Sequence, residues 1–289
     1  MSKKKVNKYF ISKSSSQEQR LADALRLLGL SHAASSLTEV NKIMTSTKAT
    51  YFDFLESLFE IEIFAKEDNR LATQTKKAKF PHLKILEEFD FSFQPSINEQ
   101  QIRELASCRF INNMENIAFF GQAGVGKTHL SIAIGNAAIQ NGMDVRFITL
   151  RNLQELIEEK LDNGEKLHRL LAELQKPKLL IIDEIDSFID KNNEAVQENK
   201  NSNTTKSSED ITSDNLSLFI SKLITDRHMV GSTIFTANQS FGAWSSLFGS
   251  EIRAEAILDR IIGNCTVIEI RGPSYRTKDK LDLYNLSSV

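Results

Sequence analysis

The residues with the clearest chemical pattern form a glycine-rich loop between an apolar stretch and a helical stretch. Glycines let a backbone curl so that its N–H groups converge on an anion, and a following helix adds the positive end of its dipole. Lys127 can reach the β- and γ-phosphates of a nucleotide, and the Thr128 hydroxyl can ligate Mg²⁺. The pattern therefore predicts a nucleotide site that includes His129 at the start of the helix. The loop, which fits G-x-x-x-x-G-K-[ST], comprises Gly121, Gln122, Ala123, Gly124, Val125, Gly126, Lys127 and Thr128.

Two acids follow a second apolar stretch, residues 179–182. A continuous apolar run is typical of a strand buried on both faces, and side chains at the carboxyl end of such a strand lie beside the ligand. In a protein with a phosphate-binding loop this is the Walker B pattern. Asp183 is then expected to hold Mg²⁺ through its water shell, and Glu184 to orient and activate the attacking water. The alternative is a pair of surface acids after a core strand.

Three further polar residues are candidates for the same chemistry. Asn238 ends the next predicted strand, where it can reach the γ-phosphate or the attacking water, or simply begin a turn. Arg260 and Arg276 can supply the positive charge that phosphoryl transfer requires, because a guanidinium is planar and always charged. Each arginine is equally compatible with a surface ion pair. Arg227 and Arg253 are weaker candidates of the same kind.

The segments around these motifs alternate between the two regular structures. Strands that alternate with helices indicate an α/β fold with a parallel sheet flanked by helices. Residues 190–212 are rich in Asn, Ser, Thr and Glu, and we expect a disordered or mobile surface insertion there. The apolar spacing predicts strands at 117–120, 145–149, 179–182, 232–236 and 266–270, and helices at 128–140, 150–174, 216–226 and 252–262.

The segment before residue 80 reads as a small all-helical domain. Apolar spacing predicts helices at 17–28, from Ser31, and from Thr50 to residue 79, and Thr50 with Asp53 resembles a capping box. We expect the aromatic residues of the third helix to be core rather than base-stacking platforms. Its far end forms a basic edge of Arg70, Lys76, Lys77 and Lys79.

A linker with three alternating phenylalanines, Phe89, Phe91 and Phe93, follows this domain, and a helix is predicted from 97 to 108. Alternation indicates an extended segment with one packed face. That face lies against either the adenine side of a nucleotide pocket or the body of the domain, and packing on the body is the favoured interpretation.

Composition narrows the class of protein. Residues 1–84 contain 15 Lys and Arg and 9 Asp and Glu, a net charge of +6, so the remainder carries −8 of the total of −2. A basic N-terminal segment on an acidic remainder indicates either a nucleic-acid contact or a solvated face without a partner.

No apolar run reaches the ~18 residues of a membrane span. The basic N-terminus has no apolar stretch of a signal peptide behind it. Cys108 and Cys265 form no disulfide framework, and we expect a cytoplasmic protein.

Taken in order, these residues resemble the IstB-like ATPases, the transposition helper proteins of IS21-type insertion sequences, which in turn resemble the helicase loader DnaC. The resemblance runs from about Leu25 to Arg276. Beyond the loop and the Walker B pattern, it rests on Thr128-His129-Leu130, Phe89 to Pro95, Arg227-His228, Ser232-Thr233-Ile234, Asn238, Phe241, Trp244, Phe248-Gly249, Ala256 to Arg260 and Gly272 to Arg276.

The resemblance implies an AAA+ ATPase that binds ATP and Mg²⁺. It makes Asn238 the sensor-1 residue, Arg260 the arginine finger of a neighbouring subunit and Arg276 a sensor-2-like arginine. It also implies a homo-oligomer, a ring or helix on DNA, that engages a transposase. The sequence departs from the family pattern at residues 185–188 with the insertion behind them, and at His228, where the family tends to have Tyr.

Two alternatives to the transposition helper remain, a replicative helicase loader and a nucleotide-binding interaction module with weak hydrolysis. The intact Asp183 and Glu184 pair argues against the interaction module.

The sequence also predicts the domain organisation. Its segments are a disordered basic tail at 1–16, a helical DNA-engaging domain at 17–79, a linker and first helix at 80–110, the ATPase domain at 111–276 and a C-terminal tail at 277–289.

Overall fold

The computed structural model describes residues 16–47, 49–187, 208–248 and 250–278. The chain divides into two compact units, Met1–Thr73 and Gln74–Val289. The predicted basic tail, apart from Ser16, lies outside the described residues, and so does most of the predicted insertion at 190–212.

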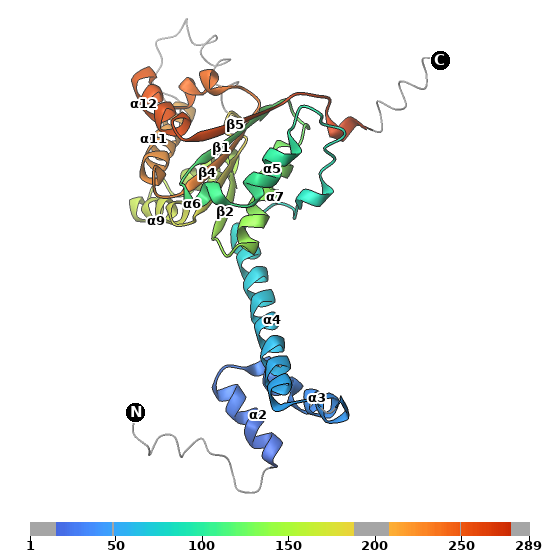
Figure 1. The fold of residues 1–289 in the computed structure, drawn as a ribbon. Coiled ribbons are helices and arrows are strands. Elements are labelled where there is room, and N and C mark those ends of the chain that lie inside the picture. The colour runs from blue at the N-terminus through green and yellow to red at the C-terminus, as the bar shows by residue number, and fades with distance from the viewer. Residues whose placement is uncertain (1–15, 48, 188–207, 249, 279–289) are drawn as a thin grey trace, which may run out of the picture. The chain divides into compact units, whose positions relative to one another are not determined.

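The described part of the first unit is helical (Figure 1). Its helices are α2 (Gln17–Leu27), α3 (Ser31–Thr47) and the first part of α4 (Tyr51–Ala78). Its core is small and largely aliphatic, and includes Leu25, Leu37 and Leu58. The buried carboxylate of Glu62 accepts hydrogen bonds from the backbone N–H groups of His32 (2.8 Å) and Ala33 (2.9 Å) at the start of α3.

Helix α4 begins with the capping box that the sequence predicts. The Thr50 N–H donates to Asp53 Oδ2 (2.7 Å), and the Asp53 N–H donates to Thr50 Oγ1 (3.3 Å). The prediction that the aromatic residues of this helix form a core is wrong for Phe52 and Phe64, which are 84% and 78% exposed. The helices of this unit enclose a core too small to accommodate every apolar side chain of α4.

The second unit is built on a parallel five-stranded sheet in the order β2-β3-β4-β1-β5. The strands β3, β4 and β1 are therefore neighbours at the centre. Their carboxyl ends carry the Walker B acids, Asn238 and the glycine-rich loop, respectively, so the sheet order brings the three motifs to one edge. The strands are β1 (Asn116–Gly121), β2 (Val145–Thr149), β3 (Leu179–Asp183), β4 (Ser232–Ala237) and β5 (Cys265–Ile270).

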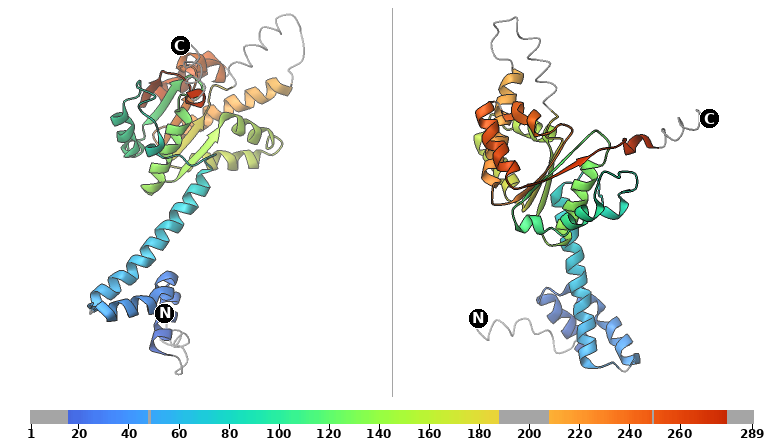
Figure 2. Two further views of the ribbon diagram at one scale, coloured as in Figure 1. Left: turned by 90° about the vertical axis from the view of Figure 1, so that its right-hand side faces the viewer. Right: turned by 45° about the horizontal axis from the view of Figure 1, so that its top comes forward.

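Helices cover both faces of this sheet, as Figures 1 and 2 show. Helices α5 (Glu99–Ala106) and α7 (Lys127–Gln140) lie on one face. The core on the other face includes Ala118, Phe120 and Ile182, which alternate with residues that face α7. The helices of this second face are α8 (Leu150–Glu158), α9 (Gly164–Gln175), α11 (Ser208–Arg227) and α12 (Glu251–Ile262).

Three predicted helices differ from the observed ones by more than one residue at a boundary. The helix expected at 150–174 is two helices, because the Asn163 side chain accepts from the Lys166 N–H (3.1 Å) and begins α9. Helix α11 begins at Ser208, so the last residues of the predicted insertion are helical. Helix α5 ends at Ala106, and Cys108 adopts a left-handed conformation (φ 64°) before the short α6 (Arg109–Asn112).

The phenylalanine linker forms turns and a 3-10 helix, η1 (Leu86–Glu88), rather than an extended segment. The Gln94 N–H donates to the Phe91 carbonyl (3.2 Å), and the Asp90 carboxylate accepts from the Phe93 N–H (3.1 Å). An aspartate that bonds to a following backbone N–H favours a turn, and this local chemistry outweighs the alternating pattern. Within the described residues, no helix is both long and apolar enough to cross a membrane.

Candidate nucleotide site

The glycine-rich loop joins β1 to α7 and has the backbone that its glycines allow. Gly124 and Gly126 have φ angles of 83° and 108°, values that disfavour other residues. A Cβ atom on Gly126 would lie 2.5 Å from the ring of Phe89, so a larger residue here would also displace that ring. The last two residues of the loop, Lys127 and Thr128, are the first two of α7, where unpaired N–H groups of a helix favour an anion.

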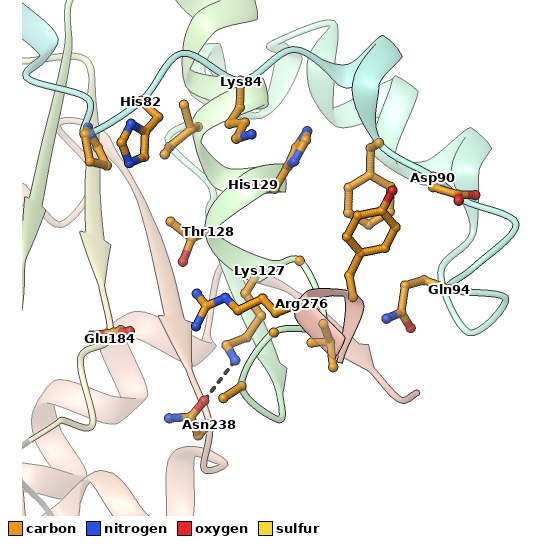
Figure 3. A pocket seen from close by; sticks show the side chains of 18 of the residues that line it. His82, Lys84, Asp90, Gln94, Lys127, Thr128, His129, Glu184, Asn238 and Arg276 are labelled. Carbon is orange, nitrogen blue, oxygen red and sulfur yellow. Dashed lines mark hydrogen bonds between the residues drawn. The ribbon is translucent and has the colours of Figure 1, made fainter. Parts of the chain in front are cut away.

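The ammonium group of Lys127 is held at the mouth of this loop. Its Nζ donates to the carbonyl oxygens of Gly121 (2.6 Å) and Gln122 (2.9 Å) and to Asn238 Oδ1 (2.9 Å), the last of these drawn in Figure 3. Burial lowers the pKa of Lys127, and the charges of Asp186 and Asp183 oppose that shift. The group thus has a fixed position beside the place where phosphates would bind.

Asp183 lies within hydrogen-bond distance of two hydroxyl groups. Thr128 Oγ1 donates to it at 2.9 Å, and Thr236 Oγ1 donates at 2.6 Å. Asp183 is only 4% exposed, so burial raises its pKa, while the bonds from Thr236 and Thr128 act in the opposite direction. Paired carboxylate and hydroxyl oxygens are ligands that Mg²⁺ accepts, so these residues fit the predicted metal site.

Glu184 follows Asp183 in a left-handed conformation (φ 53°) that turns the chain at the end of β3. Its side chain is exposed and lines the same pocket as Lys127. The Glu184 N–H donates to Thr236 Oγ1 (2.9 Å), and the Ile185 N–H donates to the Thr236 carbonyl (3.0 Å). Thr236 therefore supports both acids. Its role was not predicted from the sequence, because its contacts depend on the adjacency of β3 and β4.

Arg276 reaches the pocket from the far end of the chain. It belongs to η4 (Tyr275–Thr277), which is fixed to the loop where the Tyr275 N–H donates to the Gly124 carbonyl (2.9 Å). Figure 3 shows its guanidinium pointing into the space between Lys127, Thr128 and Glu184. The structure thus brings Arg276 together with Lys127, Thr128 and Glu184 in one pocket.

The opposite end of the pocket is lined by the linker and by His129. His129 Nε2 donates to the Ile85 carbonyl (3.0 Å), and its ring packs edge-on against Phe89 at 5.3 Å. Burial lowers the pKa of His129, so its imidazole is neutral near pH 7. Phe89 lines the cavity together with Pro81 and His82, and the whole cavity has a volume of about 340 Å³. The linker therefore supplies a wall of the pocket.

The remaining arginines lie elsewhere. Arg260 projects from α12, donates to the Ala256 carbonyl (3.2 Å) and does not line the pocket of its own chain. Arg227 is 2% exposed and donates to backbone carbonyls including those of Pro177 (2.9 Å) and Ser232 (2.6 Å). Burial lowers its pKa to about 10. Arg227 is a structural residue, and the interpretation of it as a weaker candidate for phosphoryl transfer is wrong.

Comparison with known proteins gives a consistent result over most of the chain. The sequence pattern of the IstB-like ATP binding protein family matches residues 21–202 and 206–282. An insertion sequence IS232 putative ATP-binding protein from Bacillus thuringiensis subsp. berliner is 37% identical over 268 residues, which cover 92% of this chain and 98% of that protein. An insertion sequence IS21 putative ATP-binding protein from Pseudomonas aeruginosa is 34% identical over 261 residues, covering 90% and 88%.

Similarity to solved structures is lower. A crystal structure of the DnaC helicase loader has a TM-score of 0.44 and 21% identity, and the match covers 60% of this chain and 88% of that one. Similarity at this level supports no inference about function.

Proposed function

The chain belongs to the family of IstB-like ATP binding proteins, and from this premise we propose that it hydrolyses ATP and acts on DNA during transposition of an IS21-type insertion sequence. The observation that carries the hydrolysis is the contact of Thr128 Oγ1 with Asp183 (2.9 Å) in a pocket that also holds Lys127 and Glu184. Transposition is supported by family membership and by the insertion sequence relatives from Bacillus thuringiensis and Pseudomonas aeruginosa.

The proposed reaction is an in-line attack of water on the γ-phosphate. The backbone of the glycine-rich loop and the ammonium of Lys127 bind the phosphates, while Glu184 orients the water and accepts its proton. Asn238, whose Oδ1 accepts from Lys127 Nζ at 2.9 Å, would contact the γ-phosphate or the water. Arg276 neutralises the charge that develops on the phosphoryl oxygens and the leaving group.

Thr128 and Asp183 would hold Mg²⁺, which would supply positive charge beside the β- and γ-phosphates when it is bound. A Mg²⁺ ion at such a site is bound by few protein ligands together with substrate phosphates and water.

A complete site requires a second subunit in this proposal. Arg260 does not line the pocket of its own chain, and an arginine finger acts on the nucleotide of a neighbour. We therefore propose that the active form is a homo-oligomer in which Arg260 of one chain faces the phosphates bound by the next.

The proposed DNA contact rests on the net charge of +6 over residues 1–84, from 15 basic and 9 acidic residues. The lysines Lys76, Lys77 and Lys79 at the end of α4 are the first residues to change. Replacing all three with glutamine in the full chain should weaken binding to duplex DNA and reduce the slope of log affinity against log salt by about 0.9 for each phosphate that the variant no longer neutralises. An unchanged slope would contradict a DNA contact at these lysines.

The experiment that tests the whole proposal measures ATP turnover of the full chain with and without duplex DNA, and capture of the transposase encoded by the same insertion sequence. We expect turnover, DNA binding in the presence of ATP, and ATP-dependent capture of the transposase. Capture of a replicative helicase in place of the transposase would contradict the transposition proposal and would leave the hydrolysis proposal standing.

A further inference from the structure

A second buried acid lies next to the proposed catalytic residues, and the proposed reaction does not use it. Asp186 is 3% exposed and follows Glu184 by two positions. Its Oδ2 accepts hydrogen bonds from the backbone N–H groups of Asn238 (2.6 Å) and Gln239 (2.7 Å). Its Oδ1 is buried and has no hydrogen-bond partner among the described residues. A buried carboxylate is costly unless its contacts compensate for lost hydration, so the two short bonds must contribute substantially.

These two bonds fix the loop that begins where β4 ends. The side chain of Asn238 is fixed as well, because its Oδ1 accepts a hydrogen bond from Lys127 Nζ (2.9 Å). The carbonyl of Gln239 accepts from Nε1 of the fully buried Trp244 (3.2 Å). Asn238 is therefore constrained through its backbone by Asp186 and through its side chain by Lys127.

Asp186 is itself placed by the turn that carries Glu184. The Ser187 N–H donates to the Glu184 carbonyl (3.0 Å), and Glu184 has the left-handed φ of 53°. The Ile185 N–H donates to the Thr236 carbonyl (3.0 Å), which fixes the same turn to β4. Glu184 and Asn238, which follow different strands, are thus connected through the backbone of this turn and the Asp186 carboxylate.

We propose that Asp186 is a positioning residue for ATP hydrolysis, whose carboxylate holds Asn238 against Lys127 and couples the position of Asn238 to that of Glu184. This inference rests on the proposed function. The inference also goes beyond that function, because neither the glycine-rich loop nor the Walker B pattern includes Asp186. The negative charge of Asp186 also opposes the lowering of the Lys127 pKa by burial.

The inference predicts a change in the rate of the chemical step rather than in nucleotide affinity. Asp186→Ala removes the acceptor of both N–H groups and releases Asn238. Displacement of a positioning group by about 1 Å costs on the order of 100-fold in rate, so we expect kcat to fall about 10- to 100-fold. KM and the affinity for a fluorescent ADP analogue should change less than about threefold, since this substitution leaves the loop and Lys127 in place.

A double-mutant cycle separates positioning from a general loss of structure. If Asp186 acts through the side chain of Asn238, Asp186→Ala should cause little further loss of kcat in an Asn238→Ala background. Asp186→Asn keeps an oxygen acceptor and should lie between the wild type and Asp186→Ala. Asp226→Asn is the matched control, because Asp226 accepts from Gln175 Nε2 (2.6 Å) and does not line the pocket. We expect Asp226→Asn to leave kcat unchanged.

Three results would overturn the inference. The first is a wild-type kcat in Asp186→Ala. The second is a loss of kcat/KM in this variant that comes entirely from a higher KM. The third is a loss of kcat in the double variant that equals the product of the losses in the two single variants. If Asp186→Ala does not fold, a wild-type kcat in Asp186→Asn overturns it instead. Failure of the proposed function is distinguishable, because in that case the wild-type chain itself shows no turnover above the rate of Glu184→Gln.

Discussion

The hydroxyl of Thr236 connects the two acids of the site, so its removal is a direct test of how the site is built. Thr236→Val keeps the shape of the side chain and deletes the donor to Asp183 (2.6 Å) and the acceptor of the Glu184 N–H (2.9 Å). Thr236 is fully buried, so water cannot replace either bond. Loss of a bond to a charged group together with an orphaned backbone donor costs about 3 kcal/mol. For a domain of this size that corresponds to a fall in Tm of about 6–12 °C.

The same substitution should alter catalysis in a characteristic way. The Thr236 hydroxyl opposes the rise in the pKa of Asp183 that burial causes, so its loss raises that pKa further. Asp183 then becomes protonated at a higher pH, and the acidic limb of the kcat profile should move upward in pH.

The assays are a calorimetric melt without nucleotide and a pH profile of phosphate release. Thr236→Ser keeps the hydroxyl and serves as the matched control, with both quantities near wild type. A valine variant with wild-type Tm and an unmoved acidic limb would refute the role given to this hydroxyl.

Other predictions follow from the same geometry. Lys127→Ala should abolish nucleotide binding measured by fluorescence titration, and retained affinity would contradict its place at the phosphates. Asp183→Asn should stop turnover yet raise the Tm of the ligand-free protein. The folded-state pKa of Asp183 is raised, so its contribution to stability is complete below its unfolded pKa and is lost as pH rises through its folded pKa; a lower Tm would refute this. Arg260→Ala should be inactive alone and regain turnover when mixed with Lys127→Ala, and no recovery would contradict an arginine finger in trans.

The features that could be predicted from the sequence are those encoded locally. The glycine-rich loop and the acids after β3 each follow an apolar run within a few residues, so motif and strand are recognised together. The alternation of strands and helices indicated the parallel sheet, and the capping box at Thr50 and Asp53 is likewise a short-range pattern.

The features that the sequence did not reveal depend on residues far apart in the chain. Thr236 contacts Asp183 across 53 positions, and Asp186 contacts the N–H of Asn238 across 52, because β3 and β4 are neighbours. The sequence offers Arg227 as a candidate for phosphoryl transfer, but in the structure its guanidinium donates to backbone carbonyls. The prediction of an extended phenylalanine linker failed for a different reason, because the turn that Asp90 stabilises outweighs the alternating pattern.

The central claim is that this pocket hydrolyses ATP with Glu184 activating the water. Steady-state phosphate release and equilibrium ATP binding, measured together for the wild type and Glu184→Gln, test it most directly. We predict that the variant binds ATP in the presence of Mg²⁺ as tightly as the wild type and that its turnover falls by about 100-fold or more. Turnover in Glu184→Gln equal to that of the wild type would contradict the claim.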